Sequence, residues 1–266
     1  MVGEDIANDL AAYNLPILAM GDPGQLPPVK GTWGFDMENP DVFLTEIHRQ
    51  AAENPIIQLA TLARNGELIR PGDYGDGVKV VKRRDDDVSL NTERDAMVLV
   101  GTHNKRFAMT TAIRNALGIE SSGPVEGEPI LVQRNSRKYP ALVNGSILTC
   151  MQDVGDLTDG GVSIDIRLQD PDQDFLEYTL KCPQALFEEH HFKKRDAYSG
   201  PTKAVYTAKT NLEHLDWGHV LTVHKAQGSE WDDVVVHDES GVFRGDGDRW
   251  LYTGITRAAK KLTLVI

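Results

Sequence analysis

The chain lacks several features that mark common classes of protein. Its 266 residues include only two cysteines, Cys150 and Cys182, too few for a disulfide framework or a four-ligand zinc site. No apolar run approaches the roughly 18 residues that a membrane span needs. The brief apolar run Leu15–Met20 follows acidic residues instead of the basic lead of a secretory signal. We therefore expect a protein of the reduced cytoplasm, with no membrane partner.

The chain also lacks an excess of positive charge. Forty acidic residues against 28 basic ones give a net charge of -12, whereas dedicated nucleic-acid binders usually show a basic footprint. Basic residues can still line one groove while acidic ones cover the opposite face. The composition therefore argues against strong unassisted binding to DNA, but it does not exclude contact.

The apolar pattern predicts alternating helices and strands over most of the chain, and the length favours more than one domain. We expect a buried strand at Leu15–Met20, followed by a turn-rich loop at Gly21–Val29. The other expected elements are helices at Glu4–Tyr13, Ile56–Ala63 and Lys105–Leu117, the last ending at Gly118, and strands at Val78–Val81 and Ala96–Val100.

The middle of the chain has a different pattern. Between Val143 and Gly218, short alternating stretches are separated by glycine and aspartate turns, which is typical of a small antiparallel barrel or sandwich. The expected strands there are Ser146–Met151, Val162–Leu168, Phe175–Lys181 and Ala204–Ala208. Val220–Val223, Val234–His237 and Leu262–Ile266 then return to β-branched runs, as in a parallel α/β sheet. The sequence thus predicts an α/β domain interrupted by a β-rich insert.

Five sequence blocks, taken in order, resemble helicase motifs. They are Gly21–Val29 (GDxxQLPPV), Leu44–Gln50 (LTxxxRQ), the strand and turn Val98–Arg106, Leu221–Val236, and Leu251–Ala258 (YTxxTRA). Together they resemble the C-terminal half of a superfamily 1 DNA helicase. The likeness is strongest to the RecD-like and Dda-like branch, superfamily 1B, which moves 5′ to 3′ and is common in bacteriophages.

The resemblance implies a fold and a setting. In such helicases two RecA-like lobes of the P-loop NTPase type clamp ATP, and single-stranded DNA crosses both. Residues 1–40 would be a remnant of the first RecA-like lobe, 41–142 plus 219–266 the second lobe, and 143–218 an SH3-like small β-barrel. The implied role is DNA replication or recombination in the cytoplasm of a bacterial or phage-infected cell.

The resemblance also implies a nucleotide site. Arg49 and Arg257 match the two motif arginines that reach the γ-phosphate, and an arginine supplied across a cleft can contribute about 10³–10⁵ in rate. Gln25 would sense the γ-phosphate or its attacking water. The structural alternatives are surface salt bridges for the arginines and a polar turn residue for Gln25. Asp22 fits a turn or cap as well as it fits a functional role.

Three residues after Leu221–Val223 complete the implied nucleotide set. Gly228 would let the backbone approach the nucleotide, Gln227 lies beside it, and Glu230 would accept from a ribose hydroxyl. The alternative for Glu230 is a carboxylate at a helix start, where the helix dipole favours negative charge.

The implied DNA contacts lie in two places. Thr222 and His224 alternate along a strand and so should share one face, where they would hold the phosphate backbone. Thr102, Asn104 and Arg106 would form a comparable turn after Ala96–Val100. Lys193–Arg195 is either a further DNA-facing patch or, more simply, a solvated loop.

The chain departs from the helicase pattern in its phosphate and metal ligands. It has no GxxxxGK[ST] loop to cradle phosphates, and the acidic motif that holds Mg²⁺ would fall before Met1. We interpret Asp238-Glu239-Ser240 as an imitation of that motif and expect no metal site. ATP and Mg²⁺ are therefore cofactors by resemblance alone. We expect negligible ATPase and no unwinding from the chain alone.

Two functions remain open at the level of the sequence. The first is the C-terminal part of an ATP-dependent helicase, with the ATP site completed by a separate N-terminal fragment. The second is a non-catalytic module that binds single-stranded DNA or a replisome protein. A fragment with no independent role is a third alternative, and its exposed first-lobe strand should make it prone to aggregate.

Overall fold

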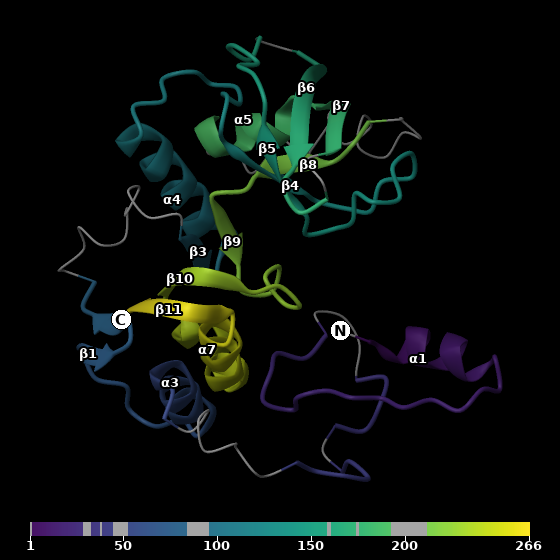
Figure 1. Cartoon of the computed structure of the whole chain (residues 1–266), viewed down its shortest axis with the longest axis vertical. Helices are drawn as coiled ribbons and strands as arrows, with labels where there is room; N and C mark the ends of the chain where they lie inside the picture. Colours follow the sequence, from purple (N-terminus) through teal and green to yellow (C-terminus); the bar gives the residue numbers. More distant parts are fainter. Residues whose placement is uncertain are drawn as a thin grey trace. The chain divides into compact units, whose positions relative to one another are not determined.

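The computed structural model describes residues 2–28, 33–37, 39–44, 53–83, 96–158, 161–173, 176–192 and 212–266 (Figure 1). Three sequence predictions lie outside these residues: Arg49 with most of its motif, the strand Ala204–Ala208, and the basic run Lys193–Arg195. The chain divides into two compact units. The first unit is Met1–Ser89 with Ala226–Ile266, and the second unit is Leu90–Lys225.

The first unit contains a small mostly parallel sheet with helices. Its helices are α1 (Glu4–Ala11), α3 (Pro55–Arg64), the 3-10 helix η3 (Ser240–Asp246) and α7 (Gly247–Ile255), and its strands are β1 (Gly72–Gly75), β2 (Val78–Val81), β10 (Trp231–His237) and β11 (Ala258–Val265). Strand β11 pairs in parallel with both β10 and β2, and β1 adds an antiparallel strand to β2. The predicted parallel α/β arrangement is therefore confirmed for this part of the chain.

Local sequence explains why α3 and α7 form beside this sheet. Asn54 caps α3 by accepting a hydrogen bond from the Ile56 amide at 2.8 Å, and Pro55 occupies the first turn, where its missing N–H costs nothing. Helices α3 and α7 pack against each other. In α7, Trp250 and Ile255 are fully buried. The apolar face of each helix thus supplies the core beneath the strands.

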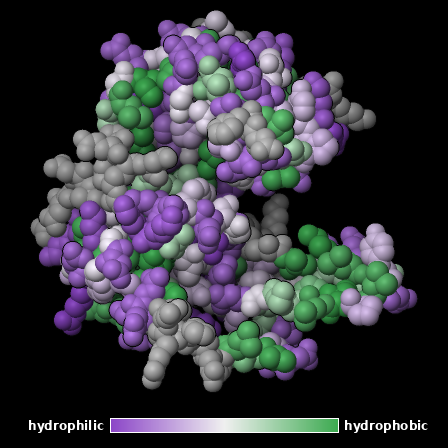
Figure 2. Space-filling view, in the orientation of Figure 1, coloured by the Kyte–Doolittle hydropathy of each residue, from purple (hydrophilic) through white to green (hydrophobic). Residues whose placement is uncertain are grey.

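One predicted strand in the first unit is wrong. Helix α1 forms nearly as expected, but Leu15–Met20 has neither helix nor strand structure. Leu18 is 83% exposed and Met20 88% exposed. A strand needs a neighbour for its backbone hydrogen bonds, and no described strand lies beside this segment. Figure 2 shows hydrophobic side chains gathered on the N-terminal segment that carries α1.

The second unit begins with a short parallel pair and a long helix. Strand β3 (Met97–Val100) pairs in parallel with β9 (Val220–Thr222), and helix α4 spans His103–Ala116. Gly118 follows the end of α4 with a φ of 71°, a left-handed conformation that suits glycine and confirms the predicted helix end.

The rest of the second unit is a five-stranded antiparallel sheet. Its strands are β4 (Pro129–Val132), β5 (Ile147–Cys150), β6 (Ser163–Asp170), β7 (Leu176–Pro183) and β8 (Leu215–Trp217), in the order β7-β6-β5-β4-β8, and helix α5 (Ala185–Phe192) follows β7. The amide of Glu213, just before β8, also donates to the Lys181 carbonyl in β7 at 2.8 Å. The predicted antiparallel character is confirmed. The expected insert at 143–218 supplies β5 to β8, whereas β4 precedes that range in the same sheet.

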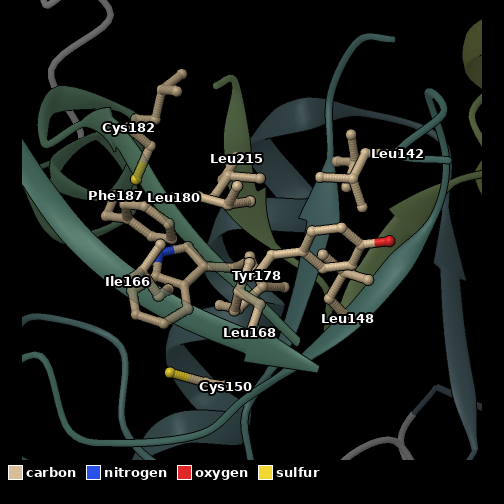
Figure 3. Packing of buried hydrophobic residues seen from close by; sticks show 14 residues of the cluster. Leu142, Leu148, Cys150, Ile166, Leu168, Tyr178, Leu180, Cys182, Phe187 and Leu215 are labelled. Carbon is tan, nitrogen blue, oxygen red and sulfur yellow. The ribbon is translucent and has the colours of Figure 1, made fainter. Parts of the chain in front are cut away.

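This sheet encloses its own apolar core (Figure 3). Phe187 from α5 meets the Trp217 ring edge-on, with centroids 4.9 Å apart. Both cysteines belong to the core, and burial raises the pKa of each thiol. The thiols are therefore protonated packing groups and do not act as reactive nucleophiles.

Two buried ion pairs fix α4 against the antiparallel sheet. Arg114 donates through Nε to Glu128 Oε1 at 2.7 Å, and its guanidinium stacks 4.0 Å from the centroid of the Trp217 ring. His219 also approaches Glu128, at 2.9 Å. One turn from the start of α4, Arg106 bonds Asp216 of β8 at 2.7 Å.

None of the described helices is long and apolar enough to cross a membrane.

Candidate functional site

The loop that contains Gln25 is a tight turn organised by Asp22. Oδ1 of Asp22 accepts from the Gly24 amide at 2.8 Å, and the Asp22 carbonyl accepts from the Gln25 amide at 3.2 Å. A Cβ on Gly24 would lie 3.2 Å from both Arg64 and Tyr252, so a larger residue here would require these side chains to shift slightly. Asp22 therefore does shape the turn, as one alternative predicted, and Gln25 stands half-exposed beside it.

Helix α7 anchors this loop at two points. The Leu26 amide donates to Thr253 Oγ1 at 3.0 Å, and the Tyr252 hydroxyl donates to Asp22 Oδ2 at 2.6 Å. Burial, reinforced by the bond to Asp22, raises the pKa of Tyr252 to about 12. The hydroxyl is thus a permanent donor at physiological pH. Sequence reasoning missed Tyr252 and Thr253, although both belong to the YTxxTRA block.

Arg257 follows α7 and is held almost entirely by backbone and hydroxyl oxygens. Its guanidinium donates to the carbonyls of Thr253 and Ser229 at 3.1 and 3.0 Å and to Thr256 Oγ1 at 3.1 Å. No carboxylate of the described residues lies within ion-pair distance. Burial lowers the pKa of Arg257, while the negative charge of Glu230 acts in the opposite direction. The surface salt bridge that was the structural alternative is therefore not what the structure shows.

Gln227, Gly228 and Glu230 lie just before β10. Gln227 Nε2 donates to the Leu26 carbonyl at 3.1 Å, while its Oε1 is buried and accepts no hydrogen bond from the described residues. Gly228 has a φ of 85° and open space on its Cβ side. Glu230 is exposed and leads directly into a strand, so the alternative of a helix-start carboxylate is wrong.

These residues form one cluster within the first unit. Gln227 and Thr253 both bond Leu26, Tyr252 bonds Asp22, and the charges of Asp22 and Glu230 both act on Arg257. Five of the six candidate nucleotide residues are thus described, and all five belong to the same unit: Gln25, Gln227, Gly228, Glu230 and Arg257. The sixth, Arg49, lies outside the described residues.

The candidate DNA residues all belong to the second unit, and the structure corrects their local setting. Thr102, Asn104 and Arg106 do not form a turn, because α4 begins at His103 with Thr102 as its N-cap, accepting from the Lys105 amide at 3.2 Å. Asn104 is exposed in the first turn of α4. Arg106 is buried and paired with Asp216, which gives its charge a structural partner.

Thr222 and His224 do not share one face of a strand. Strand β9 ends at Thr222, whose side chain is buried, and His224 lies in the turn that follows, at 223–228. The β9 strand ends because the chain folds back at once, with the Lys225 amide donating to the Thr222 carbonyl at 2.8 Å. We call residues 223–228 the β9 turn. His224 is half-buried within it.

The described residues match one side of an ATP site better than they match a metal site. An arginine without an acidic partner and a buried unpartnered amide oxygen suit a polyphosphate and its sugar. No group of three or more metal-binding side chains occurs in the described parts of the chain. Asp238, in the imitation motif, instead accepts from the Ser240 amide at 2.8 Å.

Comparisons with known proteins are consistent with this geometry. Residues 218–265 match the UvrD-like helicase C-terminal domain. The ATP-dependent RecD2 DNA helicase of Deinococcus radiodurans is 26% identical over 266 residues, an alignment that covers 97% of this chain and 34% of RecD2. The chain thus spans about a third of that relative.

Solved structures of Pif1 helicases have a similar fold. Pif1 from Candida albicans matches with a TM-score of 0.52 and 16% identity, covering 92% of this chain and 62% of that protein. Pif1 from Bacteroides, solved with ADP-AlF3 and single-stranded DNA, matches with a TM-score of 0.52 and 16% identity, covering 99% and 68%. The chain is therefore similar to a UvrD-like helicase C-terminal domain over residues 218–265 and to RecD2 over most of its own length, and it shares the fold of these Pif1 structures.

Proposed function

We propose that this chain is the C-terminal part of an ATP-dependent 5′-to-3′ DNA helicase. It would supply arginine fingers and single-stranded DNA contacts to an ATP site that another polypeptide segment completes. The helicase C-terminal domain at 218–265 supports this proposal, since in RecD2 the corresponding region belongs to an ATP-dependent enzyme.

One observation carries the proposal: the loop of Gln25 and the helix that leads to Arg257 are hydrogen-bonded to each other. The bonds from Leu26 to Thr253 and from Tyr252 to Asp22 fix the loop on α7. Gln25 and Arg257 are then positioned by a single piece of structure. A group that senses the γ-phosphate and a group that stabilises its leaving charge need such a fixed relation, because misplacement by about 1 Å can cost 10²-fold in rate.

Each residue of the cluster would have a distinct task. Arg257 would donate to the γ-phosphate with the N–H groups that its backbone partners leave unused, and its planar fork suits bidentate contact. Gln25 would orient the attacking water. Glu230 would accept from a ribose hydroxyl, and the buried Oε1 of Gln227 would accept from a nucleotide donor. Bound ATP would supply the phosphoryl group and the free energy of its hydrolysis.

The remaining parts of the ATP site would come from elsewhere. The described residues do not fit Mg²⁺, and the sequence has no GxxxxGK[ST] loop. Arginine fingers act on a phosphate that is already held, so they cannot replace these ligands. The exposed apolar side chains of α1 and the segment after it, such as Ile6, Leu15 and Leu18, support docking of a first-lobe fragment that would pair Leu15–Met20 as a strand.

Reconstitution tests the proposal. The purified chain would be mixed with a fragment that carries the phosphate loop and the Mg²⁺ ligands of a RecD2-like helicase, and ATP hydrolysis measured with and without oligothymidylate. We expect no turnover from the chain alone and DNA-stimulated turnover from the mixture. Arg257→Ala should lower that turnover by about 10³-fold or more. Lys260→Ala, on the exposed side of β11, is the matched control and should not change it. A rate of ATP hydrolysis by the mixture that is unchanged in Arg257→Ala would contradict the proposal.

The alternative is a catalytically inactive module that binds single-stranded DNA or a replisome protein. The observation that favours it is the placement of every candidate DNA residue in the second unit, whereas the described nucleotide residues are in the first. DNA affinity that is indifferent to nucleotide, to Arg257→Ala and to the added fragment would support this module and exclude the helicase part.

A further inference from the structure

We propose that the loop between β4 and β5, residues 133–146, is a further binding surface for the phosphates of single-stranded DNA. We call it the basic loop. The inference rests on the proposed DNA-binding function and adds to it a surface outside the helicase motifs. Its ligand is the sugar-phosphate backbone of a single strand, recognised by charge without reading the base sequence.

The charge of the basic loop is unusual in this acidic chain. No aspartate or glutamate occurs between Glu128 and Asp153, whereas Arg134, Arg137 and Lys138 lie within that span. All three side chains are exposed. The chain as a whole carries a net charge of -12, so this local cluster of positive charge is not apparent from the overall composition.

The basic loop is ordered by its own hydrogen bonds. Ser136 Oγ accepts from the Lys138 and Tyr139 amides at 3.2 and 2.9 Å, and the Ser136 amide donates to the Leu142 carbonyl at 2.9 Å. Leu142 is 1% exposed and belongs to the core of the antiparallel sheet. A loop anchored in this way loses little conformational entropy when it binds, because its backbone is already fixed.

The basic loop is joined directly to the β9 turn. Lys225 Nζ donates to the Gln133 carbonyl at 3.4 Å and to Asn144 Oδ1. The Asn144 amide in turn donates to Asn135 Oδ1 at 2.8 Å. His224, a candidate DNA contact, precedes Lys225 in the same turn. The basic residues therefore lie next to a position at which a DNA contact is already expected, and the basic loop, His224 and Lys225 all belong to the second unit.

Two acidic side chains near the basic loop, those of Asp216 and Glu213, are already hydrogen-bonded. Asp216 accepts from Arg106 at 2.7 Å and from Gln133 at 2.5 Å, so its charge is balanced in the interior. Glu213 accepts from Ser136 Oγ at 2.8 Å and is the acidic neighbour of Lys138. The arginines and Lys138 thus retain an excess of positive charge toward solvent. An acidic protein segment could meet such charge, but the continuity with the β9 turn favours DNA.

Salt-dependent binding of the full chain to a fluorescent oligothymidylate tests the inference. The variant Arg134→Gln/Arg137→Gln/Lys138→Gln removes the charges of the basic loop. The control Lys82→Gln/Lys260→Gln/Lys261→Gln removes as many exposed charges from the first unit. Because each neutralised phosphate contributes about 0.7 to the slope of log K against log salt on single strands, the basic-loop variant should lower that slope by about 2. The control should leave the slope unchanged.

Each outcome has a distinct meaning. Equal slopes for the basic-loop variant and the wild-type chain, with loss of binding in Asn104→Ala or His224→Ala, would overturn the inference and retain the proposed DNA function. No binding by the wild-type chain even at about 50 mM salt, where phosphate contacts are strongest, would overturn both. Polyglutamate binding that is lost in the basic-loop variant, with oligothymidylate binding unchanged, would assign the surface to an acidic protein segment. Circular dichroism of each variant verifies that it is folded.

Discussion

The hydroxyl of Tyr252 donates to Asp22 Oδ2 at 2.6 Å and thereby joins two sequence blocks that lie 230 residues apart. Tyr252 belongs to α7, ahead of Arg257, and Asp22 organises the turn that holds Gln25. Arg64 lies over the same tyrosine ring, 5.9 Å from its centroid. The contact connects the two parts of the candidate nucleotide site.

Tyr252→Phe should weaken that connection. Removal of the hydroxyl takes a donor from a charged acceptor, so we expect the free energy of unfolding to fall by about 1–2 kcal/mol, measured by urea denaturation. Tyr74→Phe is the control, because the Tyr74 hydroxyl bonds an exposed carbonyl of Arg70, and it should change stability by less than about 0.5 kcal/mol. Equal effects of the two substitutions would show that the bond to Asp22 stabilises nothing.

Arg106→Met should destabilise the fold without a change in the salt dependence of DNA binding. The substitution leaves Asp216 buried without its cation, which costs about 3–5 kcal/mol. Arg167→Met, which breaks an exposed pair with Glu177, should cost no more than about 1 kcal/mol. A lower salt slope in folded Arg106→Met would instead restore the sequence-based assignment of Arg106 to DNA.

His214 should stay neutral well below its ordinary range. Burial, assisted by the positive charge of Arg134, lowers the pKa of His214 to about 4 from 6.5. Between those two pH values His214 is protonated in the unfolded chain and neutral in the folded chain. The free energy of unfolding therefore falls as the pH drops from 6.5 toward 4. NMR titration of the imidazole measures the pKa directly. Arg134→Gln should raise it, and a His214 pKa near 6.5 in the wild-type chain would contradict the prediction.

Gly228→Ala should cost about 1–2 kcal/mol through backbone strain alone. The φ of 85° at Gly228 lies in the left-handed region, while the Cβ of alanine would meet nothing within 4 Å. Gly241→Ala is the matched control, since its Cβ also meets nothing and its φ is outside that region. We expect thermal denaturation to separate the two variants. If both were neutral, the β9 turn would be adapting its backbone.

The sequence predicted those elements whose patterns are long or well punctuated. Helix α4 ends just before Gly118, as expected, and the β-branched runs Val234–His237 and Leu262–Ile266 form parallel strands. These predictions succeeded because burial on both faces requires continuous apolar runs, which leave a strong local signal. The prediction of a strand at Leu15–Met20 was wrong because local composition is not sufficient. The apolar residues favour a strand, but a strand forms only where another backbone pairs with it.

The sequence alone also determined which residue types are available at the candidate site. It singled out Gln25, Gln227 and Arg257, and the structure brings them into one unit with Tyr252 and Thr253, to which the sequence had assigned no role although both lie in the YTxxTRA block. It could not assign the partner of Arg106, because Asp216 lies 110 positions away along the chain. Only tertiary structure decides such pairings, since a buried charge takes whatever opposite charge the fold brings within a few ångströms. The sequence thus determines which side chains are available and which local elements they favour. The contacts of each side chain, and hence its role, are decided by tertiary packing.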